Sequence, residues 1–516
     1  MKPDSLADPR DQPCTVIESA QVLSLDTQDH QWSCADIVVR SGRIERIGPQ
    51  AARADLGAVA RVIPAHGLLA MPGLINAHFH SPGNLMKGSL AGHPLEIFML
   101  HEVPPLAESA DGGRLIYLRT LLGALEMLRR GVTAVQDDAY HVPKATAESV
   151  DAIMRAYQDV GIRATVAIDQ PTLIEYDKYP YLESLLPEAE REAMRQAPRQ
   201  SSQELLGLYD HLIHSWHGAA QGRLRAAVSC SAPQRVEPEY ALALSDLSRQ
   251  HDLPYYVHLL ETRLQRVLGD TRYGRSLVQE VHAQGWLDER LMAIHAIWVD
   301  EQDIELLGQS RCTVAHNPVC NLRLGSGLMP WRALHNAGVP VCLGSDEMNT
   351  DDSVNLWFVA KTAALIHSLS SPDDRQWAQP SEVLHALTRQ GARAMRMADE
   401  LAVLQPGAWA DIILLDLDSV AYWPLNDLRR QLVHCEDGQS LRMTMVQGEV
   451  VFENGRITTV DEAAVRAELR ELLPAVTAQL ARSAREASRL EPYYRQMLAR
   501  SLLHPVGLRR TLWDAP

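Results

Sequence analysis

The sequence LINAHFHSPGN (residues 74–84) ends a short apolar run with two histidines separated by one residue. Two later stretches, YYVHLLET (255–262) and CLGSDEMN (342–349), have the same form: a strand-like apolar run with a potential metal ligand at its C-terminal end. The four side chains are His78, His80, His258 and Asp346. Segments so far apart build one site only if their strands lie parallel, with their C-terminal ends on one face. That is the geometry of a (βα)8 barrel.

The region between these stretches predicts an α/β fold with a TIM-like barrel. Short apolar runs alternate with amphipathic stretches such as residues 113–131, a pattern typical of βα units and a parallel sheet. With the strand that ends at His78, there are eight candidate strands. The other seven span residues 133–138, 163–169, 224–230, 254–260, 291–297, 312–317 and 339–346. We expect the barrel to occupy residues 71–402.

Strand-like segments also occur near both ends of the chain. Residues 1–70 carry several of them, and residues 403–460 carry a matching set that includes a hairpin-like Asn454-Gly455 turn. We therefore predict a small composite β-sandwich domain built from both segments. The remaining residues, 461–516, are charged and amphipathic, which predicts a C-terminal helical tail.

Composition excludes several classes of partner. The 516 residues carry a net charge of −16 without a basic stripe, which argues against nucleic acid and anionic membranes. No apolar run approaches the ~18 residues of a membrane span, and the N-terminus lacks the apolar core of a secretory signal. Seven cysteines form no CxxC pair, which predicts reduced thiols and a cytoplasmic location.

Each candidate metal ligand alone has a structural explanation. A histidine pair on a strand is more often structural than metal-binding, His258 alone could be a core histidine, and Asp346 could cap a helix. However, His78 and His80 point to the same side of one strand. Because all four candidates end strands in barrel order, we expect one divalent metal ion, Zn²⁺ first and Fe²⁺ as the alternative.

Five ordered motifs carry a resemblance to a known family. They are MPGLINAHFH, VHLLET, AIHAIWVDEQD, VAHNPVCNLRLGSG and GVPVCLGSDEMNTDDSVNLW. These blocks resemble the signatures of the amidohydrolase superfamily, in the branch of cytosine deaminase, S-adenosylhomocysteine deaminases and triazine hydrolases. The resemblance covers about residues 15 to 460. It implies the same four metal ligands, with Glu261 as the proton shuttle and His295 beside the reacting water and the substrate.

The resemblance and the chemistry of the residues together predict a hydrolytic deaminase. A divalent ion lowers the pKa of bound water, Glu261 can pass a proton to departing ammonia, and Asp346 can accept the water proton. The substrate would be an amino-substituted N-heterocycle of the purine, pterin, pyrimidine or triazine type. Relatives with two metals bridge them with a lysine, and because no lysine occurs between residues 179 and 360, we expect one ion.

The sequence leaves two alternatives open. The same site could hydrolyse another leaving group, namely chloride, an alkylamine, a thiolate, or a urea or amide C–N bond. A non-catalytic relative that keeps the barrel is the alternative from a different class, although the intact ligands and Glu261 argue against it.

The determinants of substrate choice are less well defined. We expect residues 81–105 to form a loop over the pocket, and residues 171–222 to form a long insertion that caps the pocket or contacts a partner subunit. No arginine stands out as a recognition residue. A homodimer or larger homo-oligomer is expected from the resemblance. The candidate substrate contacts are Asn84, Met86, His295, His316 and Asn321.

Overall fold

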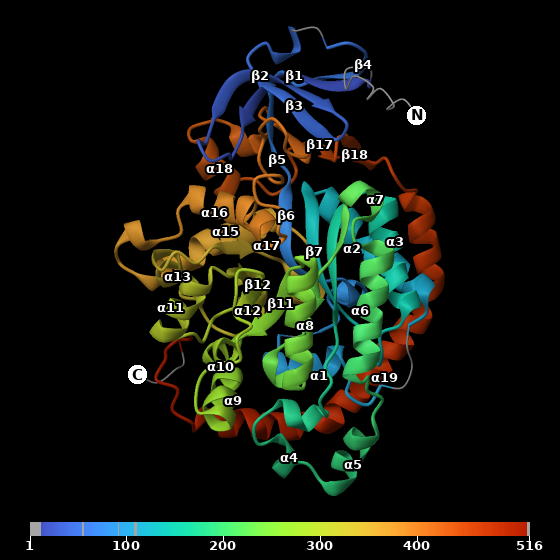
Figure 1. Cartoon of the computed structure of the whole chain (residues 1–516), viewed down its shortest axis with the longest axis vertical. Helices are drawn as coiled ribbons and strands as arrows, with labels where there is room; N and C mark the ends of the chain where they lie inside the picture. Colours follow the sequence, from blue (N-terminus) through green and yellow to red (C-terminus); the bar gives the residue numbers. More distant parts are fainter. Residues whose placement is uncertain (1–11, 54–55, 91, 108–110, 513–516) are drawn as a thin grey trace, which may run out of the picture.

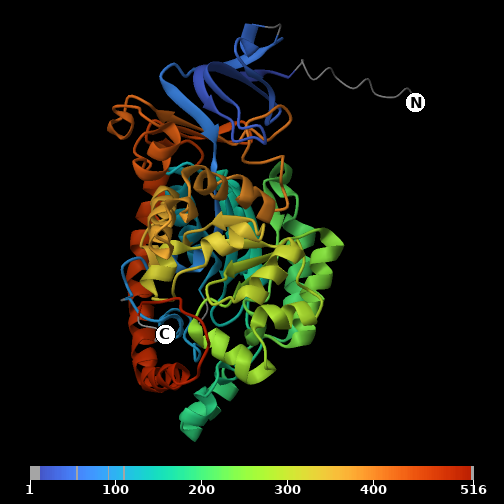
Figure 2. The same cartoon turned by 90° about the vertical axis from the view of Figure 1, so that its left-hand side faces the viewer.

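The computed structural model describes residues 12–53, 56–90, 92–107 and 111–512. A β-sheet lies at one end of the elongated molecule, and a mixed α/β body with a long C-terminal helix along its side makes up the rest (Figure 1). Figure 2 shows the same division from a second direction, with the sheet joined to the body by the strand that leads into the barrel.

The end sheet is formed by both ends of the chain, as the sequence predicts. Its nine strands are hydrogen-bonded in the order β19-β18-β17-β16-β5-β1-β2-β3, with β4 paired to β1. The strands are β1 (Cys14–Leu23), β2 (Gln31–Arg40), β3 (Arg43–Gly48), β4 (Val59–Pro64), β5 (Leu68–Pro72), β16 (Ile412–Asp416), β17 (Leu441–Val446), β18 (Glu449–Glu453) and β19 (Arg456–Ile457). The antiparallel pairing of β5 with β16 joins the two chain ends. The exact domain boundaries remain a prediction.

The barrel consists of eight strand positions. They are β6 (Leu74–His80), β7 (Val132–Tyr140), β8 (Arg163–Asp169), β9 (Leu224–Ala226) with β10 (Val228–Ser229), β11 (Tyr255–Leu259), β12 (Leu291–His295), β13 (Thr313–His316), and β14 (Val341–Leu343) with β15 (Asp346–Glu347). All pairings are parallel, in two five-stranded sheets. The sheets meet at the two interrupted strands: β9 pairs with β8 and β10 with β11, whereas β14 pairs with β13 and β15 with β6.

Close backbone approach explains one interruption. The N–H of Gly344, between β14 and β15, donates to the carbonyl of His316. A Cβ at Gly344 would lie 2.7 Å from the backbone nitrogen of His78, so only glycine fits there. The side chain of Asn76 exchanges hydrogen bonds with Ser345 across the same gap. The interruption therefore brings the strand of His78 next to the strand end that carries Asp346.

Helices cover the outside of the barrel. They include α1 (Leu95–Glu102), α2 (Gly113–Leu128), α3 (Ala147–Val160), α6 (Ser202–Trp216), α8 (Pro238–His251), α9 (Arg263–Tyr273), α10 (Leu277–Ala283), α11 (Glu301–Ser310), α12 (Pro318–Arg323), α13 (Trp331–Asn336), α15 (Leu356–Ile366), α16 (Pro380–Ala386) and α17 (Arg389–Ala394). Shorter or peripheral helices are α4 (Leu182–Leu185), α5 (Glu188–Gln196), α7 (Ala219–Gly222), α14 (Met348–Asp351) and α18 (Leu428–His434). None of the helices in the described residues is long and apolar enough to cross a bilayer.

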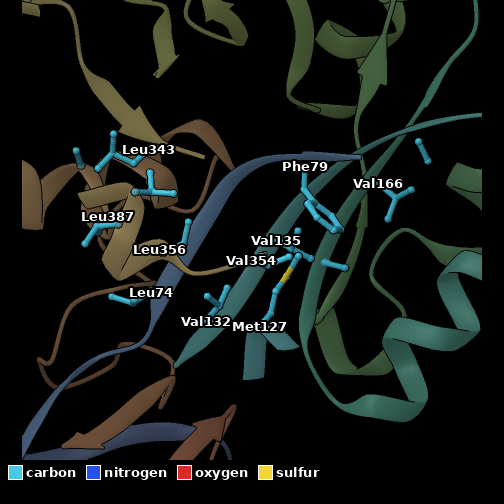
Figure 3. Packing of buried hydrophobic residues seen from close by; sticks show 14 of the residues in the cluster. Leu74, Phe79, Met127, Val132, Val135, Val166, Leu343, Val354, Leu356 and Leu387 are labelled. Atoms are coloured by element: carbon cyan, nitrogen blue, oxygen red, sulfur yellow. The ribbon is translucent and has the colours of Figure 1, made fainter. Parts of the chain in front are cut away.

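The main core lies between the barrel strands and these helices. Figure 3 shows part of it, where Phe79, Val135 and Met127 pack together. Inside the barrel the buried residues are mostly small: Ala77, Ala167, Ala227 and Ala315 belong to one inner cluster. The same cluster contains the larger side chains of Tyr256, Met292 and Ile294, so the inner face of the strands is packed.

The C-terminal tail is a long helix, α19 (Glu462–Leu502), as expected. Its buried residues Leu490 and Tyr494 pack in one cluster with Ile97 of α1 and Leu182 of α4. Beyond the helix, the Arg510 guanidinium donates to the carbonyls of Ile297 and Val299, just after β12. The tail thus holds segments that border the C-terminal ends of the barrel strands.

Candidate metal centre and active-site cavity

The four predicted metal ligands converge. The ring centroid of His78 lies 4.6 Å from that of His80 and 5.0 Å from that of His258. Asp346 Oδ1 lies 3.5 Å from His78 Nε2 and 3.7 Å from His80 Nε2. All four side chains are buried. Residues separated by 268 positions in the chain therefore present nitrogen and oxygen donors to one small volume.

Local backbone features aim these side chains. The β6–β7 pairing has an irregularity between Asn76 and Phe79, and such bulges redirect side chains near active sites. Asp346 has φ of 61° and His295 has φ of 74°, in the left-handed region that residues other than glycine rarely adopt. Strained backbone of this kind is concentrated at functional sites. The strand ends are thus shaped for the site rather than for regular pairing.

Hydrogen bonds fix the imidazole orientations. Nδ1 of His80 bonds the carbonyl of Asp138, and Nδ1 of His258 lies 2.7 Å from the carbonyl of Ser231. A carbonyl accepts only from a protonated Nδ1, so Nε2 of each ring keeps its lone pair for a metal. Both ring nitrogens of His78 are buried without a hydrogen-bond partner in the described part of the chain. A buried polar atom without a partner requires an explanation, and a metal bond provides one.

The charges of the cluster suit a divalent cation. Burial alone would raise the pKa of Asp346, but the imidazoles of His78, His295 and His80 hold it well below its usual value. Burial lowers the pKa of His78 to about 4, although Asp346 opposes this shift. At neutral pH the site therefore holds a neutral His78 imidazole and the carboxylate of Asp346. Three nitrogens and one oxygen fit a single divalent ion, and Zn²⁺ fits best.

Glu261 and His295 lie beside these donors. Glu261 Oε2 is 3.6 Å from His295 Nε2, which in turn is 3.6 Å from Asp346 Oδ2. Burial and then the charge of Asp346 raise the pKa of Glu261 well above its usual value, so the carboxyl can hold a proton at neutral pH. The Oε1 atom of Glu261 is buried without a partner in the described part of the chain. Glu261 can therefore exchange a proton with a bound molecule.

A cavity lies over the cluster. His80, His258, Glu261, His295 and Asp346 line its base. The segment after β6, which includes α1, contributes the apolar residues Leu95, Met99 and Val103, as its sequence position suggests. Apolar walls exclude water and strengthen the electrostatic interactions inside.

The segment after β8 forms the rim of the cavity. Glu175 and Lys178, in the 3₁₀ helix η4 (Glu175–Lys178), pair at 2.7 Å and line the cavity together with Tyr179. The hydroxyl of Tyr494 in α19 donates to Glu175 at 2.9 Å, so the C-terminal helix anchors the rim. The insertion is shorter than the predicted 171–222, because residues 202–216 form α6, a helix that packs on α3 and β9.

Four of the five predicted substrate contacts are not among the residues that line the cavity. The Asn84 amide donates to the carbonyl of Arg119 in α2, and Met86 lines a separate hollow. Nε2 of His316 lies 3.0 Å from Nε2 of His367, so this nitrogen of His316 has a hydrogen-bond partner within the protein. Nδ1 of His295 donates to Oδ1 of Asn321 at 2.9 Å, so Asn321 orients His295. Among the described residues, only His295 of the five lines the cavity.

The sequence analysis did not identify several charged residues that line the cavity, among them Asp169 and Arg235. Asp169 is the last residue of β8, a position equivalent to that of the metal ligands, so its place at a strand end was a usable signal. Arg235 ends a one-turn 3₁₀ helix, η5 (Pro233–Arg235), after β10, and no pattern in the sequence identifies it.

Metal-dependent hydrolases on βα barrels place their ligands at the strand ends in this way. The sequence makes the assignment specific. The family model described as "Amidohydrolase family" matches residues 69–451, and the chain belongs to this family.

Curated relatives match over nearly the whole chain. A 5'-deoxyadenosine deaminase of Methanosarcina mazei is 28% identical over 466 residues, which cover 90% of this chain and 99% of that protein. A 5-methylthioadenosine/S-adenosylhomocysteine deaminase of Pelotomaculum thermopropionicum is 27% identical and covers 88% of this chain and 97% of its own length.

Solved structures show the same fold. A triazine hydrolase from Arthrobacter aurescens superposes with a TM-score of 0.82 at 25% identity and covers 90% of this chain and 100% of its own. An adenosine deaminase from Xanthomonas campestris, solved with bound zinc, has a TM-score of 0.78 at 24% identity, with 90% and 100% coverage.

Proposed function

We propose that this chain is a zinc-dependent aminohydrolase, which replaces an exocyclic amine on an N-heterocycle with water and releases ammonia. One observation carries the proposal: the buried carboxyl of Glu261 lies beside His295 and Asp346 in a cavity whose base is a metal-type donor set. The deaminase names of the curated relatives support the same reaction class.

His78, His80, His258 and Asp346 would hold the ion. When bound, Zn²⁺ lowers the pKa of a coordinated water toward ~7 and so supplies a nucleophile at neutral pH. The hydrogen bonds from Nδ1 of His80 and His258 to backbone carbonyls keep both rings in the tautomer that can bind it.

Glu261 would move the proton. Its raised pKa lets it donate a proton to a ring nitrogen of the substrate and later transfer one to the leaving amine. His295 donates from Nδ1 to Asn321, so its Nε2 carries a lone pair and can accept a proton at that atom. The apolar side chains of the segment after β6 exclude bulk water during these steps.

The test is the Glu261→Gln variant, assayed for ammonia release from amino-purines, pterins, pyrimidines and triazines with zinc-loaded protein. Glutamine keeps the shape but cannot transfer a proton, so turnover should fall by about 10²- to 10⁴-fold while zinc content is unchanged. Glu305→Gln, on the exposed face of α11, is the matched control and should behave as wild type. Full activity of Glu261→Gln would refute the proton-transfer role.

The same assays distinguish the second reaction. The likeness to a triazine hydrolase favours one alternative, the hydrolysis of a different leaving group at the same site. Release of chloride or an alkylamine from triazines, without ammonia from any amino-heterocycle, would favour it over deamination.

Two further expectations are part of the proposal. We expect a homodimer or larger homo-oligomer and a cytoplasmic location. All seven cysteines are free thiols, and five of them are buried, which is consistent with a reducing compartment.

A further inference from the structure

The C-terminal helix α19 lies beyond the residues that the family model matches, yet it reaches the surroundings of the active-site cavity. The match ends at residue 451, whereas α19 spans Glu462–Leu502. Figure 1 shows α19 running down the side of the barrel and across the end opposite the end sheet. Its buried residues Leu490 and Tyr494 belong to the cluster that contains parts of α1 and α4. The helix therefore packs against segments that surround the cavity.

One polar contact links α19 directly to the cavity lining. Tyr494 is fully buried, and its hydroxyl donates to Glu175 Oε1 at 2.9 Å. Burial and then the charge of Glu175 raise the pKa of Tyr494 well above its usual value, so the hydroxyl keeps its proton and donates. The other carboxylate oxygen, Oε2, accepts from Nζ of Lys178 at 2.7 Å. Since Glu175 and Lys178 both line the cavity, this contact joins the helix to the rim.

The rim has little core of its own. The 3₁₀ helix η4 is a single turn without a side-chain cap, and Tyr176 is its one buried residue. A short segment of this kind holds charged side chains in one position only when other elements fix them. The ring of Tyr494 also contacts Tyr179, a cavity residue, with the ring centroids 5.8 Å apart and the planes at 70°. Tyr494 therefore supports the rim through both its ring and its hydroxyl.

Other residues of α19 hold the segment that follows the rim. Arg489 donates to Glu190 of α5 at 2.8 Å, and Arg500 donates to Ser184 of α4 at 3.2 Å. These contacts are exposed, and exposed ion pairs contribute little to stability. The buried hydroxyl of Tyr494 is therefore the contact of α19 that matters most for the position of the rim.

The rim and the base of the cavity offer different chemistry. The base holds Glu261, His295 and Asp346, the groups that would act on the reacting ring. At the rim, Nζ of Lys178 makes its one hydrogen bond within the described residues to Glu175. An ammonium group has three N–H donors, so it can also donate to an oxygen of a bound molecule. Such an oxygen would lie on a substituent of the ring, because the ring itself occupies the base.

We propose that Tyr494 is a positioning residue: its hydroxyl fixes Glu175, and Glu175 fixes the ammonium of Lys178, so that the rim binds an oxygen-bearing substituent of the heterocycle. This inference rests on the proposed aminohydrolase function for the identity of the ring. It gives α19, a helix outside the matched family region, a role in substrate binding.

The test measures binding apart from turnover. Calorimetry is carried out on zinc-loaded Glu261→Gln protein, with adenosine and adenine as one pair of probes and cytidine and cytosine as the other. In each pair only the nucleoside carries the oxygen-bearing substituent. Adding Tyr494→Phe should raise the Kd of each nucleoside by about 10-fold, the order expected for one hydrogen bond to a charged group, and that of each base by less than about twofold. Tyr493→Phe, the neighbouring tyrosine of α19, is the matched control and should leave every Kd unchanged.

Two further measurements assign the effect to Glu175. In a Glu175→Ala background the tyrosine hydroxyl has lost its acceptor, so Tyr494→Phe should change the Kd of a nucleoside by less than about twofold. Hydrogen exchange of the Asp177 amide, which donates to the carbonyl of Ile174, should be faster in Tyr494→Phe than in Tyr493→Phe. Zinc content and thermal melting show whether each variant keeps its fold and metal site.

The outcomes are separable. Equal weakening of nucleosides and bases, an unchanged Kd in Tyr494→Phe, or a full effect in the Glu175→Ala background would overturn the positioning role. Unchanged hydrogen exchange at Asp177 would overturn it as well. If the Glu261→Gln protein bound no nucleoside more tightly than its base, the contact between rim and substituent would be wrong. If the zinc-loaded wild type released no ammonia from any compound, the proposed function would fail, while the binding result would still decide the role of Tyr494.

Discussion

A buried ion pair between Arg163 and Asp411 joins the barrel to the end sheet. Arg163 begins β8, and Asp411 immediately precedes β16. The guanidinium donates from Nε and Nη2 to the two carboxylate oxygens at 3.0 and 3.1 Å, and both side chains are at most 1% exposed. The N–H of Gln447 also donates to Asp411, at 2.8 Å.

Removing one partner should be much more costly than removing both. Arg163→Met leaves a fully buried carboxylate with only the Gln447 N–H, so the free energy of unfolding should fall by about 3–5 kcal/mol. In the double variant Arg163→Met/Asp411→Leu no charge remains, and the loss comes from the unsatisfied N–H of Gln447 and the missing donor to the Gly222 carbonyl. That loss should be about 1–3 kcal/mol.

The assay is chemical denaturation of the zinc-loaded protein, followed by far-ultraviolet circular dichroism. Arg375→Met removes an exposed pair with Asp373 and serves as the control, with a midpoint that should not change measurably. The reasoning is refuted if the double variant is as unstable as, or less stable than, Arg163→Met. It is also refuted if Arg163→Met unfolds at the wild-type midpoint.

Three other perturbations test the site and the core. His258→Ala should lose most of its zinc on dialysis, whereas His214→Ala, at an exposed position, should keep it. If the zinc content of His258→Ala equalled that of the wild type, His258 would not be a ligand. Gly344→Ala should weaken zinc retention, because its Cβ would lie 2.7 Å from the backbone nitrogen of His78, and normal zinc affinity would contradict the close approach. Burial and then Arg332 lower the pKa of His367 to about 3 in the folded protein, below the ~6.5 of an unfolded chain. The unfolded state therefore binds the extra proton, and stability falls with pH below ~6.5, by about 2 kcal/mol between pH 7 and 5. Denaturation at pH 7 and at pH 5 should show that the free energy of unfolding of His367→Gln changes less between these pH values than that of the wild type, by about 2 kcal/mol. An equal change in both proteins would contradict the role of His367.

The strand ends were predictable from sequence because their periodicity and their ligands are local features. The predicted strand at 163–169 has the observed bounds of β8, and the histidines and Asp346 converge as expected. The side-chain directions were less predictable. Asn84 contacts α2 and His316 contacts His367, since each finds a partner far away in the sequence.

Arg235 shows the same limit. It is placed by a single turn after β10 and by the N–H groups of Thr172 and Leu173, more than 60 residues earlier. No local spacing encodes such a contact. The interruption of the strand before Asp346 was also not predictable, because Gly344 matters only through its approach to His78.

The pairing of β5 with β16 affects how the chain acquires its structure. The ribosome makes β5 about 340 residues before its partner β16, so one edge of the first strands stays unpaired during most of synthesis. Long-range pairing of this kind is slow, and exposed strand edges invite association between nascent chains. Variants that slow the folding of the barrel should therefore aggregate during expression before any other defect is seen.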